Sequence, residues 1–212
     1  MSFRIAGSLL WVSSLQYFVV QIIAAAAFEG GFSIASNTIS DLGNSVCGLY
    51  GDRYVCSPLH PLMNASFILV GTTQLLGAAL LYKSMKSSRL RLFGFGSMVL
   101  AGVGTIVVGI FPENTIGTLH VIGAALPFVF GNLSMIALGS QLKLPRWLKT
   151  YSYVSGILGL LALVLFLLKM YPGIGQGGME RIVAYPQTMW MVVVGLNYLY
   201  HKKTRGAATG RG

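Results

Sequence analysis

The sequence predicts an all-α integral membrane protein: a six-transmembrane-helix bundle with both termini cytoplasmic and a long outer loop after the first helix. Three observations predict this fold. Of the 212 residues, 54% are hydrophobic and only 9% are charged, whereas about a quarter of the residues in a soluble domain are charged. Six apolar stretches are long enough to cross a bilayer, and the basic residues gather in alternate connections. Intrinsic disorder and an ordinary soluble enzyme are excluded, because the chain has too little polar surface to remain in water.

The six apolar stretches define the predicted spans. Each contains about 20 residues, the length that crosses a hydrocarbon core of about 30 Å as a helix. A backbone inside lipid must satisfy its own hydrogen bonds, so such stretches fold as helices. We place them at about residues 5–28, 61–82, 92–111, 118–139, 149–169 and 183–200. Residues 1–205 then form one transmembrane domain, and the tail 206–212, which lacks periodicity, is expected to be disordered.

The basic residues predict the orientation in the cell membrane. Connections 83–91 and 143–149, the N-terminus and the C-terminal tail hold all 15 Lys and Arg residues except Arg53, Lys169 and Arg181. Cytoplasmic connections retain basic residues, so both termini are predicted to be cytoplasmic. The five acidic residues all fall on the outer side: Glu29, Asp41, Asp52, Glu113 and Glu180. The net charge of +10 therefore indicates a basic rim beside anionic lipid headgroups and not a nucleic-acid-binding surface.

Amide side chains within the spans are expected to point into the bundle. An amide that faces lipid without a hydrogen bond costs several kcal/mol. Bonding between helices is the simpler interpretation, and a polar track through the bundle is the alternative. The residues are Gln16, Gln21, Asn64, Gln74, Asn132 and Asn197.

The segment at about 29–60 is long, polar and rich in glycine, and we expect it to cap the bundle. The chain's only cysteines, Cys47 and Cys56, lie within it. On an oxidising outer face they are predicted to form a disulfide. A reduced pair that binds a metal is the alternative, although no further cysteine ligands are present.

Four residues near the outer ends of the spans are candidate catalytic residues: Asp41, His60, His120 and Glu180. Carboxylates and imidazoles that converge can perform acid–base chemistry, and His60 and His120 could also hold a metal. No HExxH, GxSxG, Walker or CxxC motif supports either possibility. Histidines at a membrane edge commonly form only local hydrogen bonds, and Ser40-Asp41 also fits a helix cap. The sequence requires no cofactor.

Two further residues are candidates for lipid binding. Glu180 is a favourable charge near the start of the sixth helix. Arg181 is its nearest predicted partner, or it binds a lipid phosphate. Tyr185 fits an outer aromatic belt. Arg181 and Tyr185 are therefore predicted to contact lipid.

Short motifs along nearly the whole chain carry a resemblance to a known family. They are Ser40-Asp41-Leu42-Gly43, Asn64 with the glycine-rich second helix, Gly109-Ile110-Phe111-Pro112, His120, and Glu180-Arg181 with Tyr185-Pro186. The chain resembles the bacterial and archaeal six-helix membrane proteins called domain of unknown function 998, which are distantly similar to DRAM-type membrane proteins. The resemblance implies the fold and topology and draws attention to Asp41, His120 and Glu180. It implies no reaction, and the cysteine pair is not assigned to the family's pattern.

Functions from different classes therefore stay open. A non-enzymatic module that binds membrane lipids or a membrane protein partner predicts that Asp41, His60, His120 and Glu180 are bonded locally or exposed, without a shared cavity. An intramembrane enzyme that acts on a lipid or isoprenoid at the outer leaflet, with or without a metal, predicts that the four line one water-accessible pocket. Small-solute transport is the third alternative.

Overall fold

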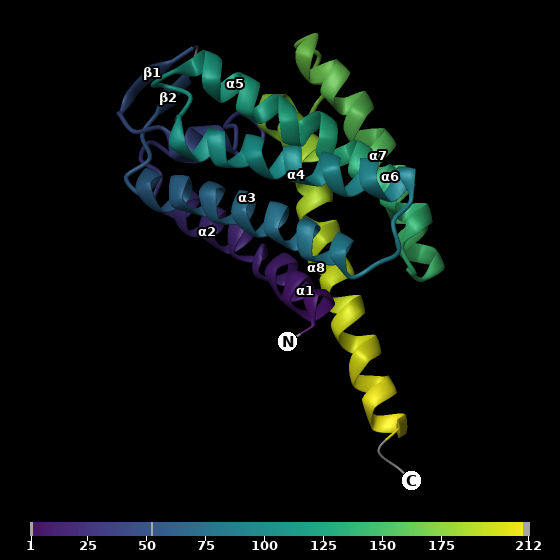
Figure 1. The fold of residues 1–212 in the computed structure, drawn as a ribbon. Coiled ribbons are helices and arrows are strands. Elements are labelled where there is room, and N and C mark those ends of the chain that lie inside the picture. The colour runs from purple at the N-terminus through teal and green to yellow at the C-terminus, as the bar shows by residue number, and fades with distance from the viewer. Residues whose placement is uncertain (1, 52, 210–212) are drawn as a thin grey trace.

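The computed structural model describes residues 2–51 and 53–209, with side chains described as far as residue 200. Within these residues the chain forms six helical units, two of them broken, as the all-α prediction requires (Figure 1). Five units are long and apolar enough to cross a membrane. The helices are α1 (Phe3–Ser13), α2 (Gln16–Ala26), α3 (His60–Lys83), α4 (Arg89–Ile110), α5 (Gly117–Leu126), η2 (Pro127–Gly131), α6 (Asn132–Gln141), α7 (Arg146–Leu167) and α8 (Gly175–Thr209).

The first predicted span is not one continuous helix, because it breaks between α1 and α2. Ser13 Oγ donates to the carbonyl oxygen of Leu10 at 2.8 Å. Ser14 Oγ shares a hydrogen bond with Thr73 Oγ1 of α3 at 3.0 Å. Adjacent serines whose hydroxyls compete for helix carbonyls and for partners on a neighbouring helix are a common cause of such a break.

The fourth predicted span is interrupted by a π-helical turn, η2, between α5 and α6. Pro127 begins the turn. Its ring has no N–H to continue the helical ladder, and it crowds the preceding turn. π-turns leave backbone groups outside the regular ladder and occur often at functional sites. The interruption lies in the middle of the unit, at residues 127–131.

The sixth helix is longer than predicted. α8 begins at Gly175, ahead of the predicted stretch 183–200, and continues to Thr209 with Pro186 inside it. Glu180 and Arg181 therefore lie within the helix and not before it. Residues 210–212 of the predicted disordered tail lie outside the described part of the chain.

The two ends of the bundle differ in their connections. The N- and C-terminal ends lie on one side, and the hairpin β1–β2 lies at the opposite end (Figure 1). At the first end, the Arg4 guanidinium lies 5.6 Å from the ring centre of Tyr198, and Arg91 donates to the carbonyl oxygen of Gln141 at 3.0 Å. We call this the basal end.

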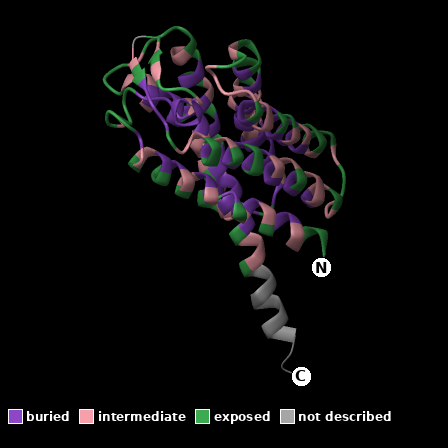
Figure 2. Cartoon of the chain, turned by 90° about the vertical axis from the view of Figure 1, so that its left-hand side faces the viewer, coloured by how far each residue is buried: buried purple, intermediate pink, exposed green. Residues whose placement is uncertain are grey.

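The basal half of the bundle is closed by a tightly packed cluster. Trp11 and Trp190 are fully buried, with ring centres 5.5 Å apart. Each indole N–H has a partner, Gln74 O for Trp11 at 3.2 Å and Ser152 Oγ for Trp190 at 2.7 Å. Buried residues concentrate between the helices, whereas exposed ones follow the outer faces (Figure 2). The basal half therefore has a sealed aromatic core.

Amides in the spans point inward, as predicted. Gln16 makes two hydrogen bonds with Ser66 of α3. Its Oε1 accepts the Ser66 hydroxyl at 2.8 Å, and its Nε2 donates to the Ser66 carbonyl oxygen at 3.2 Å. Asn132 donates to the carbonyl oxygen of Val183 in α8 at 3.1 Å. Gln74 donates to the Met98 sulfur at 3.1 Å. These contacts join different helices, which is the simpler of the two interpretations.

The outer segment packs over the other end of the bundle, and we call residues 29–59 the cap. It contains the 3₁₀ helix η1 (Ser40–Gly43) and an antiparallel hairpin of β1 (Gly48–Tyr50) and β2 (Arg53–Val55). The apolar pattern of the sequence does not predict the hairpin. The disulfide Cys47–Cys56 closes it, as predicted.

Candidate functional site beneath the cap

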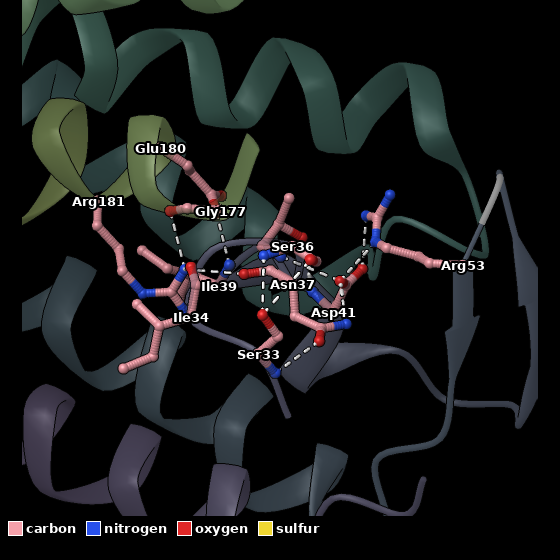
Figure 3. A network of polar contacts seen from close by, with 11 residues as sticks. Ser33, Ile34, Ser36, Asn37, Ile39, Asp41, Arg53, Gly177, Glu180 and Arg181 are labelled. Atoms are coloured by element: carbon pink, nitrogen blue, oxygen red, sulfur yellow. Dashed lines mark hydrogen bonds and ion pairs between the residues drawn. The ribbon is translucent and has the colours of Figure 1, made fainter. Parts of the chain in front are cut away.

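Asp41 is the centre of a polar network in the cap (Figure 3). It is fully buried, and Arg53 binds both carboxylate oxygens, through Nε and Nη2, each at 2.7 Å. The Thr38 backbone N–H and the Asn37 amide both donate to Oδ2 at 3.0 Å. Burial alone would raise the pKa of Asp41, but the Arg53 ion pair and the hydrogen bonds lower it below its usual value. Asp41 is therefore an ionised, fully bonded carboxylate.

Glu113 lies next to Asp41, in the connection between α4 and α5. Burial raises the pKa of Glu113, and the adjacent Asp41 carboxylate raises it further, to about 9. Its Oε1 is buried without a hydrogen-bond partner among the described residues. Glu113 therefore keeps its proton at neutral pH, and the two neighbouring carboxyl groups carry one negative charge between them.

Arg181 binds the cap from the opposite side, from α8 (Figure 3). Its Nη1 donates to the carbonyl oxygens of Ile34 at 3.0 Å, Asn37 at 2.8 Å and Gly177 at 2.8 Å. Its Nε donates to the Tyr185 hydroxyl at 3.1 Å. Arg181 is 8% exposed. The two residues predicted to contact lipid thus bind each other, and the Tyr185 hydroxyl donates to Gln21 Oε1 of α2 at 2.8 Å. Their contact with lipid stays a prediction.

Glu180 makes the second bond between α8 and the cap. Its Oε2 accepts the backbone N–H of Ile39 at 2.5 Å. The side chain is buried. This bond fixes α8 against the residue that precedes Ser40, so it positions the start of η1 over the bundle.

His120, in the first turn of α5, lies between two oxygen atoms. Its Nδ1 is 2.8 Å from the carbonyl oxygen of Phe111, and its Nε2 is 2.9 Å from Ser40 Oγ. A carbonyl oxygen can only accept, so Nδ1 carries the proton and Nε2 accepts the Ser40 hydroxyl. The pair joins α5 to the cap and orients the Ser40 hydroxyl.

A cavity lies inside the half of the bundle next to the cap, with Ile39 and Ser40 of the cap in its wall. Its volume is about 40 Å³, which holds roughly three water molecules. Five helical units contribute to the wall, whose other polar side chains are Tyr17, Gln74, Thr105, Glu180, Gln187 and Thr188. Its apolar part is mainly Phe67, Val70, Val108, Ala124, Phe128 and Ala184.

Gln187 provides an unused hydrogen-bond acceptor at this cavity. It is 4% exposed, and its Oε1 is buried without a partner among the described residues. The amide lies against Gly131 of the π-turn η2, where a Cβ atom would occupy its place. Pro127 and Phe128 of the same turn line the cavity. The interrupted helix therefore forms one side of the site.

Of the four candidate catalytic residues, Glu180 alone borders the cavity described above. Asp41 and His120 bond to neighbouring protein groups, and His60 is half-buried at the start of α3. Among the described residues, no three His, Cys, Asp or Glu side chains lie close enough to hold a metal ion. His60 and His120 begin different helices, α3 and α5, and a metal held by them stays a prediction.

Two residues of the site are not predicted by the sequence pattern. Arg53 is the partner of Asp41. Ser40, which the sequence predicts as part of a helix cap, is the partner of His120 and lies in the cavity wall. The turn at the start of η1 has a recognisable sequence signal. Thr38 and Asp41, three residues apart, each accept the backbone N–H of the other through their side chains, as in a capping box.

Comparison with known proteins gives one result. No curated protein and no solved structure matches the chain. The distant similarity to DRAM-type proteins therefore stays a prediction. Residues 11–197 match the family described as "Protein of unknown function (DUF998)". This match covers most of the chain, including the cap and the cavity, and the chain thus belongs to the DUF998 family of membrane proteins.

Proposed function

We propose that this multi-span membrane protein binds a membrane lipid in the cavity beneath the cap. The observation that carries the proposal is the mixed lining of the cavity wall. Ser40 and Glu180 supply oxygen atoms beside the cap. Within the bundle, the polar side chains of Tyr17, Gln74 and Thr188 lie among the apolar side chains of Phe67, Val108 and Phe128. A lipid has both a polar headgroup region and an apolar chain, and pockets that combine apolar surface with convergent polar groups are the usual ligand sites.

The volume of the cavity limits which part of the lipid enters it. A space of about 40 Å³ receives an ester, hydroxyl or similar polar group that replaces roughly three waters. The acyl or isoprenoid chain then extends between the helices into the surrounding membrane.

The local bonding of the charged residues favours lipid binding over metal-assisted chemistry. Asp41 is neutralised by Arg53, and Arg181 is occupied by carbonyl oxygens of the cap. These charges hold the cap on the bundle. In this proposal they keep the polar end of the cavity in shape.

We further propose that α8 is the sixth span and that both termini are cytoplasmic. The basic residues at the basal end support this orientation through the preference of cytoplasmic connections for Lys and Arg. Fusion of green fluorescent protein to the C-terminus tests it, because this protein fluoresces in the cytoplasm and not after export through the general secretory route. A dark, full-length fusion would reverse the orientation.

Native mass spectrometry of the purified full chain, released gently from detergent, tests lipid binding. We compare the wild type with Ala124→Leu, which places a larger side chain in the cavity wall. The matched control is Ala125→Leu, one residue further along α5 on its exposed face. The wild type and the control should each retain a lipid mass, and Ala124→Leu should lose most of it.

The comparison separates the cavity from the general lipid surface. Equal retention in Ala124→Leu and Ala125→Leu would show that the lipid lies outside the cavity. A wild type that carries no lipid would also overturn the proposal. Melting curves of both variants establish that the proteins compared are folded.

A further inference from the structure

The starting point is the position of Ser40 and His120 relative to the cavity. Ser40 lines the cavity and is half-buried, whereas His120 is 5% exposed and stands behind it. Ser40 therefore borders the space assigned above to the lipid's polar group, and its hydroxyl is bonded to His120, which is not part of the cavity wall.

The hydrogen bonds fix the direction of proton transfer. The Phe111 carbonyl oxygen holds the proton on Nδ1 of His120, at 2.8 Å, so the lone pair of Nε2 points at Ser40 Oγ, 2.9 Å away. A nucleophile within hydrogen-bond reach of a base, which is itself oriented by a third group, is the general arrangement of nucleophilic catalysis. Ser40, His120 and the Phe111 carbonyl form such a series.

We propose that Ser40 and His120 are the nucleophile and the general base of a hydrolase that cleaves an oxygen ester of the lipid bound in the cavity. This inference rests on the proposed function, because the ester must enter the cavity that Ser40 lines. It assigns an activity to the same site and narrows the ligand to lipids that carry an ester at their polar end.

The first step forms an acyl-enzyme. Ser40 Oγ attacks the ester carbonyl carbon while its proton moves to Nε2 of His120. The bond between this carbon and the alcohol oxygen breaks, and Nε2 returns the proton to the leaving alcohol.

The second step consumes water. A water molecule gives a proton to Nε2 and attacks the acyl carbon, the bond to Ser40 Oγ breaks, and Oγ regains the proton from Nε2. The products are a carboxylic acid and an alcohol. No oxidant, reductant or cofactor is needed, and the small cavity has room for the water once the alcohol has left.

The alternative is that the hydrogen bond only fastens α5 to the cap. A fastening role predicts that loss of either partner lowers stability without any effect on a reaction with esters. A catalytic role predicts covalent capture of an electrophile at Ser40. Covalent labelling of Ser40 in the wild type therefore distinguishes the two roles, because it does not depend on the stability of any variant.

The experiment uses the full chain in lipid nanodiscs and two probes. A fluorophosphonate reports covalent capture by mass spectrometry of the labelled peptide, and 4-methylumbelliferyl oleate reports ester hydrolysis by fluorescence. The wild type should be labelled at Ser40 and should hydrolyse the ester. Ser40→Ala and His120→Ala should each lower the rate by about 100-fold or more.

The matched control is Ser36→Ala, an exposed serine of the same cap whose hydroxyl contacts only Ser33 in the described structure. It should hydrolyse the ester as the wild type does. If Ser40→Ala retains activity, or if the label appears on another residue, the assignment is wrong. If His120→Ala fails to fold, labelling of the wild type at Ser40 still decides the question.

Lipid retention separates this inference from the proposed function. His120→Ala, whose side chain is not part of the cavity wall, should keep the co-purified lipid in native mass spectra while it loses hydrolysis. A wild type that retains lipid but is neither labelled nor active would overturn the hydrolase and leave the lipid-binding function standing. Absence of retained lipid together with inactivity would overturn both.

Discussion

Arg53 reaches both carboxylate oxygens of Asp41 at 2.7 Å from a hairpin that is itself closed by a disulfide. The carboxylate is fully buried, whereas the Arg53 side chain is 17% exposed. The ion pair joins β2 to the turn at η1. The folded hairpin and the folded turn therefore depend on each other.

Replacement of Asp41 should destabilise the protein. Asp41→Asn removes the charge that neutralises Arg53, and loss of one partner of a buried pair costs about 3–5 kcal/mol. We expect the low end of this range, since Arg53 retains some contact with solvent. A change of about 1 kcal/mol moves the melting midpoint by about 2–4 °C for a chain of this size. Tryptophan fluorescence in detergent micelles measures the midpoint.

The control for Asp41→Asn is Glu29→Gln, which also removes one acid from the cap but at an exposed position. Its melting midpoint should stay within about 1 °C of the wild type, because exposed charges contribute little. An unchanged midpoint in Asp41→Asn would contradict the structural role of the ion pair.

Stability should fall as pH rises from 5 to 9. The pKa of Glu113 is raised to about 9 in the folded protein, whereas an unfolded glutamate titrates near pH 4.5. Between these values the folded state holds a proton that the unfolded state has released. The stabilisation is therefore complete below pH 4.5 and is lost as pH rises through about 9. Melting midpoints at several pH values measure it.

Glu113→Gln provides the comparison for this pH series. The amide cannot titrate, so the decline between pH 5 and 9 should become shallower. Asp41 contributes with the opposite sign and in another range, because its lowered pKa gives stability that is lost only as pH falls below its usual value. The same slope in the wild type and Glu113→Gln would rule out Glu113 as the titrating group.

Reduction of the disulfide should loosen the cap. The Cys47–Cys56 bridge closes a loop with a sequence separation of 9, and such bridges contribute typically about 2–4 kcal/mol, less for shorter loops. We expect dithiothreitol to lower the melting midpoint of the wild type by several degrees. The double variant Cys47→Ser/Cys56→Ser should have this lower melting midpoint with or without dithiothreitol. If dithiothreitol lowers the midpoint of the double variant as well, the reductant does not act through this disulfide.

A methyl group at Gly102 should separate α3 from α4. A Cβ atom there would lie 2.7 Å from the Gly71 carbonyl oxygen, a backbone atom that cannot move aside cheaply. Overpacking of this kind costs about 1–3 kcal/mol. Gly102→Ala should therefore lower the melting midpoint. Gly96→Ala, in the same helix but with open space around the new atom, should leave it unchanged or raise it.

Much of the fold follows from the hydrophobic pattern, whose physical cause is local. The spans at 61–82, 92–111 and 149–169 match α3, α4 and α7 closely, because apolar runs of bilayer length need no tertiary information. The break at Pro127 is not predicted, because proline does not interrupt every helix: Pro186 lies inside the continuous helix α8. The break at Ser14 is not predicted either, because it depends on Thr73 in another helix.

The site was less predictable, since its contacts join distant parts of the chain. Ser40 and His120 are 80 residues apart, and only the folded bundle brings Oγ and Nε2 together. The sequence predicts either Glu180 or a lipid phosphate as the partner of Arg181. Arg181 turns inward because three carbonyl oxygens of Ile34, Asn37 and Gly177 converge on it.

The bonds between α8 and the cap also constrain the order of biosynthesis. Glu180 and Arg181 bind residues that lie 141 and 147 positions earlier in the chain. The cap leaves the ribosome after the first helix, yet its partners emerge only with the last. Domains form from the N-terminus as synthesis proceeds. The cap is therefore synthesised before α8, and its backbone groups cannot bond to Glu180 and Arg181 until the final helix has inserted. A nascent chain truncated before residue 175 should accordingly be far more sensitive to protease at the cap than the complete protein.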